Sequence, residues 1–301
     1  MSRDVIPRHG ALDPEVGAAE LAARYGLGVS GARPSPVEYT RRLWGRRHFI
    51  AAFARARGDG QYSRAHLGRL WQVMTPLLNA AVYYLIFGLL IGTRDGVPDF
   101  IPFLVTGVFV FAFTQSSVLS GVRAVSGNLG LVRALHFPRA VLPVALTLAQ
   151  LRQMLVSMAV LVVIVLLAGQ VPTWSWLLVV PVLLAQSVFN AGLALVAARL
   201  GSAVSDLAQL LPFVLRTWMY ASGVMYSIGN LTADAPLPVR VLLDLNPAAV
   251  YIDLTRFALI DSFTAAQLPP YAWGVAVAWA FVLGVGGFGY FWQAEGRYGR
   301  D

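Results

Sequence analysis

The chain has 301 residues, of which 57% are hydrophobic and only 13% are charged, and its formal net charge is +8. A soluble globular domain carries roughly 25% charged residues, so the composition argues against a soluble protein and indicates helices that cross a membrane. The chain contains neither cysteine nor lysine, which excludes disulfides, thiolate metal sites, a cysteine nucleophile, Schiff-base chemistry and the lysine of a Walker A loop. Any ATP-driven work must therefore come from a partner chain.

Residues 1–35 mix charged residues with Gly, Ala and Pro and lack the apolar core of a signal peptide. We expect a disordered cytoplasmic tail there. Residues 36–60 predict a basic amphipathic helix, because Leu43, Trp44 and Ile50 recur at helical spacing beside a polar face of arginines. Such a helix lies in the membrane interface; the alternative is a solvated helix packed on a partner. The basic side chains are Arg41, Arg42, Arg46, Arg47, Arg55 and Arg57.

Six apolar stretches follow within the predicted transmembrane domain, residues 61–295. Each has roughly the 20 residues that a hydrocarbon core of about 30 Å requires, and backbone polar groups must be paired inside lipid, so each stretch should be a helix. The sequence thus predicts an all-α integral membrane protein with six transmembrane helices. The predicted spans are residues 71–91, 100–122, 141–167, 174–198, 210–228 and 271–292.

Arginine placement sets the orientation of these spans. Twelve arginines precede Trp71, and six more fall on the same side of the predicted bundle, against three on the opposite side. The positive-inside rule then places both termini in the cytoplasm, with a short cytoplasmic tail at 296–301. The six are Arg123, Arg133, Arg139, Arg199, Arg297 and Arg300; the three are Arg94, Arg240 and Arg256.

The connection over residues 229–270, on the outer side, is too long for a simple turn and contains the pair Asn246 and Pro247. Within it, residues 250–260 are apolar but too few to span a membrane. We expect a re-entrant or interfacial helix before the last span, which is tolerated where protein or a water-filled cavity buries it.

The chain offers no constellation typical of a soluble enzyme, because no HExxH motif occurs and no histidine spacing suggests a metal site. Acidic residues lie almost wholly outside the spans, which disfavours a proton-coupled carrier. Arg152 and Arg216 fall within spans. They either snorkel to the interface or face a polar conduit and meet an anionic lipid phosphate. The four histidines are His9, His48, His66 and His136.

Aromatic residues are dense in several spans. Packing and interfacial belts explain most of them, but rings that face a conduit would offer flat faces to sugar rings and hydroxyl groups to sugar hydroxyls. The candidate conduit residues are Tyr83, Phe109, Phe113, Trp218 and Tyr226, together with Arg152 and Arg216.

Four local motifs occur in a fixed order. The first comprises Tyr62, Leu67, Gly68, Leu70, Trp71, Pro76 and Leu77. The second comprises Leu131, Val132, Arg133, Phe137, Pro138, Arg139, Leu142 and Pro143. The third is the run from Tyr220 to Tyr226, and the fourth comprises Pro238, Arg240, Leu245, Asn246, Pro247 and Arg256. Over residues 36–295 this order and spacing resembles the permease subunits of type-2 ABC exporters for lipid-linked polysaccharides, which include O-antigen, teichoic-acid and mycobacterial galactan exporters.

The resemblance implies a multi-pass protein of the bacterial plasma membrane that forms a homodimer and binds two copies of an ATP-binding subunit. ATP and Mg²⁺ would be held by that partner, and this chain would bind no cofactor or metal and catalyse no reaction. A glycan on a polyprenyl pyrophosphate carrier would pass outward through a conduit between the permeases. The second motif resembles the coupling element that docks on the ATPase; its residues here, called the coupling cluster, are Leu131, Arg133, Phe137, Pro138 and Arg139.

Other interpretations stay open at this point. A type-2 exporter of drugs or small lipids would share the fold and the partner but should show fewer aromatic residues on conduit-facing sides. A polyprenyl-linked membrane glycosyltransferase would need a catalytic carboxylate pair at the membrane surface, and none is evident. A lone secondary transporter is disfavoured, because the sequence shows neither intramembrane carboxylates nor an internal repeat.

Overall fold

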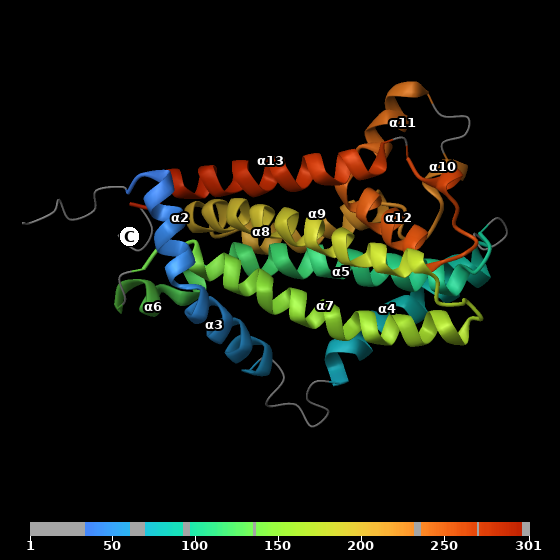
Figure 1. Ribbon diagram of the computed structural model, residues 1–301, viewed down its shortest axis with the longest axis horizontal. Helices are drawn as coiled ribbons and strands as arrows, with labels where there is room; N and C mark the ends of the chain where they lie inside the picture. Colours follow the sequence, from blue (N-terminus) through green and yellow to red (C-terminus); the bar gives the residue numbers. More distant parts are fainter. Residues whose placement is uncertain are drawn as a thin grey trace, which may run out of the picture. The chain divides into compact units, whose positions relative to one another are not determined.

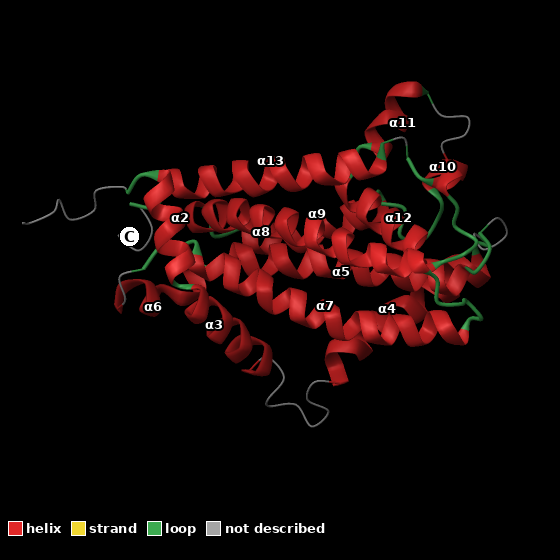
Figure 2. Cartoon of the chain, in the orientation of Figure 1, coloured by secondary structure: helices red, strands yellow, loops and turns green. Residues whose placement is uncertain are grey.

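The computed structural model describes residues 34–60, 70–92, 97–134, 137–231, 236–269 and 271–296. All regular elements in these ranges are helices, and no strand occurs among them (Figure 2). The helices belong to one compact unit, Pro36–Asp301. The predicted tails at 1–35 and 296–301 lie almost wholly outside the described residues, as do Tyr62, Leu67 and Gly68 of the first motif.

Five helical segments are long and apolar enough to cross a membrane, and they coincide with five of the six predicted spans. The first is α4 (Trp71–Tyr83), which continues as a π-helix over Tyr84–Leu90. The others are α5 (Phe100–Val122), α7 (Val141–Leu167), α8 (Val179–Ala203, preceded by a 3₁₀ turn at Trp174–Leu178) and α13 (Ala272–Gln293). Figure 1 shows α5, α7, α8 and α13 running along one common axis.

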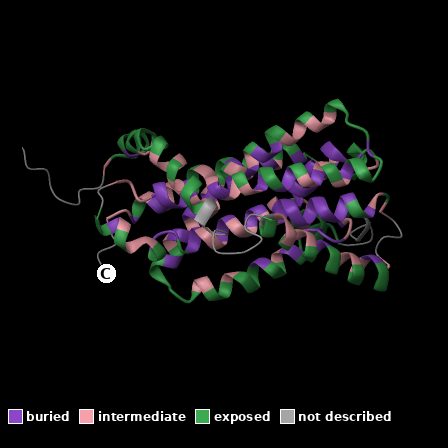
Figure 3. Cartoon of the chain, turned by 90° about the horizontal axis from the view of Figure 1, so that it is seen from below, coloured by how far each residue is buried: buried purple, intermediate pink, exposed green. Residues whose placement is uncertain are grey.

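Helix α5 lies at the centre of the bundle. In its most apolar window 72% of the residues are buried, against 11–44% in the other four spans. Helices α7 and α8 pack against it, and α13 packs against α8. Glycine permits the closest approach, since a Cβ added to Gly192 of α8 would lie 2.0 Å from the Leu283 carbonyl oxygen of α13. Helices in lipid commonly associate through such small residues, and Figure 3 shows exposed residues along the outer faces.

The structure corrects the predicted helix over residues 210–228. Helix α9 (Leu207–Tyr220) has 14 residues, about 21 Å at 1.5 Å per residue, and a turn over residues 221–226 follows it. Gly223 adopts a left-handed φ of 63°, which ends the helical path. Its carbonyl oxygen accepts a hydrogen bond from Arg256, 33 residues further along the chain. A tertiary contact therefore replaces the helical hydrogen bonds that the apolar composition predicts.

The predicted amphipathic helix consists of two helices, α2 (Pro36–Gly45) and α3 (Arg47–Gly60), separated at Arg46. Tyr39 and Ala54 are buried, whereas Trp44 is 71% exposed. The helical character agrees with the sequence prediction, and the break at Arg46 is a feature that the pattern did not indicate. The interfacial location of these helices stays a prediction.

In its described part, the long connection before the last span holds three α-helices, α10 (Ile228–Leu231), α11 (Leu237–Asp244) and α12 (Pro247–Leu259), and a 3₁₀ turn at Ala265–Gln267. Helix α12 includes most of the predicted short helix. Asn246 caps it by accepting a hydrogen bond from the Ala248 N–H at 3.2 Å, and Pro247 occupies the first helical position, which needs no donor. Nearly every residue of α12 is buried, because the helix packs between α5, α8 and α13.

Candidate functional site

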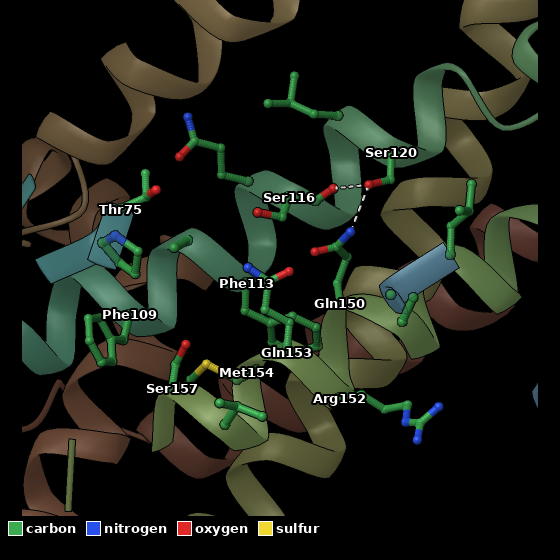
Figure 4. A pocket seen from close by; sticks show the side chains of 18 of the residues that line it. Thr75, Phe109, Phe113, Ser116, Ser120, Gln150, Arg152, Gln153, Met154 and Ser157 are labelled. Carbon is green, nitrogen blue, oxygen red and sulfur yellow. Dashed lines mark hydrogen bonds between the residues drawn. The ribbon is translucent and has the colours of Figure 1, made fainter. Parts of the chain in front are cut away.

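A cavity of about 1060 Å³ lies between α3, α4, α5, α7 and α9 (Figure 4). Its volume is at the upper end of the range of about 300–1,000 Å³ that is usual for ligand pockets, so it can hold several sugar rings. Helices α5 and α7 supply most of the lining, while α4 contributes four residues (Thr75, Pro76, Asn79 and Tyr83) and α9 contributes two (Arg216 and Met219).

The charged residues lining this cavity are all arginines. They are Arg55, Arg57, Arg123, Arg152 and Arg216, and no aspartate or glutamate occurs among the described lining residues. Because a guanidinium stays protonated in proteins, the cavity presents positive charge without internal neutralisation by a carboxylate. Arginine also matches phosphate geometry through paired N–H donors. The site is therefore suited to an anionic ligand, and to a phosphate group in particular.

Uncharged polar side chains form a second part of the lining, contributed by α5 and α7. The Gln150 side chain donates a hydrogen bond to Ser120 Oγ at 3.1 Å, and Ser120 Oγ donates to the Ser116 carbonyl oxygen at 2.7 Å, as the dashed lines in Figure 4 show. Gln153 and Ser157 line the cavity further along α7. Amide and hydroxyl groups of this kind exchange hydrogen bonds readily with sugar hydroxyls.

Aromatic rings form a third part of the lining. Phe109 and Phe113 of α5 and Tyr83 of α4 lie along one stretch of the wall. The Tyr83 hydroxyl faces Met219 Sδ of α9 at 3.9 Å, so the α4 and α9 sides meet at this ring. Of these rings, Tyr83 is half-buried, whereas Phe109 and Phe113 are only 1% and 3% exposed, so Tyr83 presents most of the aromatic surface.

The structure brings five of the seven predicted conduit residues together in this cavity. Tyr83, Phe109, Phe113, Arg152 and Arg216 all line it. Sequence reasoning did not single out Arg55, Arg57 and Arg123 for the site, although their charge was evident, because flanking arginines are expected in any multi-pass protein.

Trp218 and Tyr226 do not line this cavity. The Trp218 ring packs edge-on against Phe111 at 5.8 Å between centroids, and its N–H donates to Asn246 Oδ1 at 2.9 Å. The Tyr226 hydroxyl donates to the Tyr220 carbonyl oxygen at 2.7 Å. Because α9 ends at Tyr220, the helical spacing that related Trp218 to Tyr226 does not apply. Their role in a conduit stays a prediction.

Two side chains, the half-buried Asn246 and the buried Arg256, hold the turn that follows α9, and we call this arrangement the clasp. The Asn246 amide donates to the Ala221 carbonyl oxygen and to Ser222 Oγ, both at 3.1 Å. Arg256, which is 1% exposed, donates to the carbonyl oxygens of Gly223 at 3.0 Å and Val224 at 2.9 Å. The third and fourth sequence motifs are thereby joined in one structural unit.

The same guanidinium reaches α5 and its own helix. It donates twice to the Phe103 carbonyl oxygen, each at 3.2 Å, and it stacks over the Phe103 ring at 3.3 Å. Asp253, one turn earlier on α12, forms an ion pair with it at 3.0 Å. Gly107 leaves the space that this side chain occupies, since a Cβ there would lie 2.8 Å from Arg256 Nη2.

The coupling cluster lies just before α7. Leu131 and Arg133 belong to the short helix α6 (Leu129–Ala134), and Arg133 is exposed. The Phe137 ring lies 5.7 Å from the Phe49 ring of α3, and the Arg139 N–H donates to the Glu295 carboxylate at 2.9 Å. Pro138 completes the connection, and residues 135 and 136 lie outside the described ranges.

The structure is thus a bundle of long apolar helices with a cavity lined by arginines, which is the architecture of a multi-pass membrane protein. The sequence model described as "ABC-2 type transporter" matches residues 51–260, and the chain belongs to this family. It is therefore a transporter permease subunit rather than an enzyme, as the resemblance predicted, and ATP hydrolysis resides in a separate subunit.

Individual relatives agree with this membership. An O-antigen export system permease protein from Myxococcus xanthus is 26% identical over 70% of this chain and 80% of its own length. One from Klebsiella pneumoniae is 28% identical over 64% of this chain and 72% of its own. A polysialic acid transport protein from Escherichia coli is 24% identical over 67% of this chain and 78% of its own length.

Proposed function

We propose that this chain is the permease of an ATP-driven exporter that moves a polysaccharide, linked to a polyprenyl pyrophosphate, from the cytoplasm to the cell surface. The observation that carries the proposal is the lining of the cavity, where five arginines occur together with Tyr83 and several amide and hydroxyl groups, and where the described residues include no carboxylate. The arginines suit a pyrophosphate, and the uncharged polar groups suit the hydroxyls of a glycan. The names of the relatives, which refer to O-antigen and polysialic acid, point to the same substrate class.

Arg152 and Arg216 are the residues most directly suited to the phosphate. They lie within or beside apolar helices, where an unpaired cation is costly and therefore marks a substrate path. Both belong to the lining of the cavity, and their side chains are exposed rather than buried in protein, so they remain accessible to a ligand. The half-buried ring of Tyr83, together with the amide and hydroxyl groups of Gln153 and Ser157, then offers contact surface to the sugars that follow.

Six crossings with both termini in the cytoplasm fit this proposal. Helix α9 is too short to span the bilayer alone, so the turn at 221–226 must complete the fifth crossing. Irregular backbone at membrane depth is tolerated only where its polar groups are satisfied, and Arg256 and Asn246 supply those hydrogen bonds. Helix α12 then serves as a re-entrant helix, and the arginine asymmetry sets the orientation.

The N-terminal helices α2 and α3 suit the cytoplasmic interface. Trp44 is largely exposed, and the Arg47 guanidinium lies 5.8 Å from its ring centre. An exposed indole beside arginines is favoured at the boundary between lipid tails and headgroups. We further propose that two permeases assemble with two ATP-binding subunits, which hold ATP and Mg²⁺ and contact the coupling cluster.

The substrate chemistry can be tested with purified permease in detergent. Polyprenyl pyrophosphate should raise the melting temperature more than polyprenol of the same length, because only the former carries charge; at a concentration about 100 times Kd, binding adds about 2.7 kcal/mol of stability. The Arg152→Gln and Arg216→Gln double variant should lose this difference. Arg240→Gln, on exposed α11 and outside the cavity, is the matched control and should keep it.

Equal stabilisation by polyprenyl pyrophosphate and polyprenol would contradict the proposal. It would favour the alternative of a drug or small-lipid exporter with the same fold, because such a transporter needs no pyrophosphate site. Transfer of a sugar to a polyprenyl phosphate by the purified chain would instead support a membrane glycosyltransferase.

A further inference from the structure

Three segments far apart in sequence meet at the start of α7, through Tyr39, Arg139, Ala140 and Glu295; we call this contact the staple. The Tyr39 hydroxyl of α2 donates to Glu295 Oε2 at 2.7 Å and accepts from the Ala140 N–H at 3.1 Å. The other carboxylate oxygen, Glu295 Oε1, accepts from the Arg139 N–H at 2.9 Å. The Arg139 guanidinium also donates to the Glu295 carbonyl oxygen.

The staple is partly buried, since Arg139 and Glu295 are half-buried, and it lies beside the last span. Tyr39 is 1% exposed and Ala140 is fully buried, and the Tyr39 ring lies 5.6 Å from the Phe288 ring of α13. Hydrogen bonds to a carboxylate are roughly twice as strong as neutral ones, and they strengthen where water is excluded. One carboxylate thus fixes α2, the loop before α7 and the end of α13 relative to one another.

The position of the staple matters because Arg139 is the last residue of the coupling cluster. Helix α7 begins at Val141, so a force on Phe137 or Pro138 acts directly on α7. The hydrogen bonds between Arg139 and Glu295 also connect the coupling cluster to the end of α13. The Tyr39 hydroxyl connects it to α2.

We propose that Tyr39 and Glu295 are positioning residues that make the coupling cluster move together with α13 and α2 when ATP drives the transporter. This inference rests on the proposed contact between the coupling cluster and the ATP-binding subunit. Neither residue touches the substrate cavity, so their effect reaches the substrate only through the helices they connect.

The test uses spin labels, because the chain has no cysteine and labels react only at introduced sites. In the permease alone, labels on Val37→Cys of α2 and Ala134→Cys of α6, both exposed, should give one narrow distance distribution. Tyr39→Phe removes only a hydroxyl and should broaden it, as should Glu295→Ala. Tyr290→Phe removes a hydroxyl from the same end of α13 and is the matched control.

A second label pair measures transmission in the complex with the ATP-binding subunit. With Ala134→Cys and the exposed Val285→Cys of α13, adding MgATP should leave the distance unchanged in the parent chain and in Tyr290→Phe. It should change in Tyr39→Phe and Glu295→Ala. A merely structural role for the hydroxyl would not make this distance depend on ATP.

The inference would be overturned if Tyr39→Phe and Glu295→Ala gave the same width of the 37–134 distance distribution as the parent chain, and the same response of the 134–285 distance to MgATP. If the parent chain captures no ATP-binding subunit, the proposed assembly is refuted, and so is the proposal that the staple transmits its movement to α13 and α2. The measurement on the permease alone still decides, in that case, whether the staple orders the three segments.

Discussion

Replacing Arg256 by methionine removes the most highly connected side chain of the clasp while keeping a long apolar stem. Five hydrogen bonds disappear, and the carbonyl oxygens of Phe103, Gly223 and Val224 lose their donors, as does the Asp253 carboxylate. Each buried acceptor left unsatisfied costs about 1–3 kcal/mol, and breaking a buried ion pair costs about 3–5 kcal/mol. Because the turn can relax and partly rehydrate, the expected loss of stability is on the order of 5 kcal/mol rather than the full sum.

Two assays measure this loss. Unfolding in mixed micelles by increasing denaturing detergent gives the global free energy, and reactivity of Val224→Cys toward a thiol reagent reports the turn, since Val224 is fully buried. Arg240→Met changes an exposed arginine of α11 and should shift stability by no more than about 0.5 kcal/mol. If Arg256→Met were no less stable than Arg240→Met, and its cysteine at 224 stayed protected, the clasp would have no part in holding the fold.

Four further results are expected. Gly107→Ala should destabilise the permease by about 1–3 kcal/mol through overpacking against the buried Arg256 guanidinium. Gly274→Ala is the control and should have no such effect, because no atom lies within 4 Å of the added Cβ. Equal melting temperatures of these two variants would contradict the prediction. Burial raises the pKa of Glu295 above its ordinary value, so the folded state binds the carboxyl proton more tightly than the unfolded state does. The stability of the fold therefore decreases as pH rises through the raised pKa. A plot of melting temperature against pH should lose this decrease in Glu295→Gln, and an unaltered decrease would refute the assignment of the pH dependence to Glu295. Phe137→Ala with Arg139→Ala should weaken capture of the ATP-binding subunit by about 2 kcal/mol or more and uncouple transport, and undiminished capture with normal export would show that the loop is only a turn. The purified chain alone should hydrolyse no ATP above a contaminant control, because it lacks the required lysine.

The long spans could be predicted from sequence because their signal is local. Residues 100–122 carry no charge and residues 141–167 carry only Arg152, and a stretch of this kind must form a helix in lipid because its backbone polar groups have to be paired. Helices α5 and α7 accordingly begin and end where the composition indicates. Arg152 and Arg216 stood out for a similarly local reason, since a cation within an apolar run is costly, but the sequence left open whether they reach the membrane interface or face a conduit.

The apolar composition of residues 210–228 did not indicate the end of α9, although Gly223 within this segment is the residue that leaves the helical path. The composition continues apolar past Tyr220, and the turn forms because Arg256 and Asn246, from a segment at least 20 residues later, satisfy its carbonyl groups. The staple is equally inaccessible, since Tyr39 and Glu295 are 256 residues apart. Pairings of this kind depend on how the helices assemble, and a single sequence gives no signal for them.

The central claim is that the arginine-lined cavity carries a glycan on an anionic lipid, and the most direct measurement is made in cells. Deleting the gene should cause glycan linked to polyprenyl pyrophosphate to accumulate on the cytoplasmic side, with loss of the surface polysaccharide. The parent chain and Arg240→Gln should restore the surface polysaccharide, whereas the Arg152→Gln and Arg216→Gln double variant, present at equal amount in the membrane, should not. Undiminished surface polysaccharide after deletion, or full restoration by the double variant, would contradict the account.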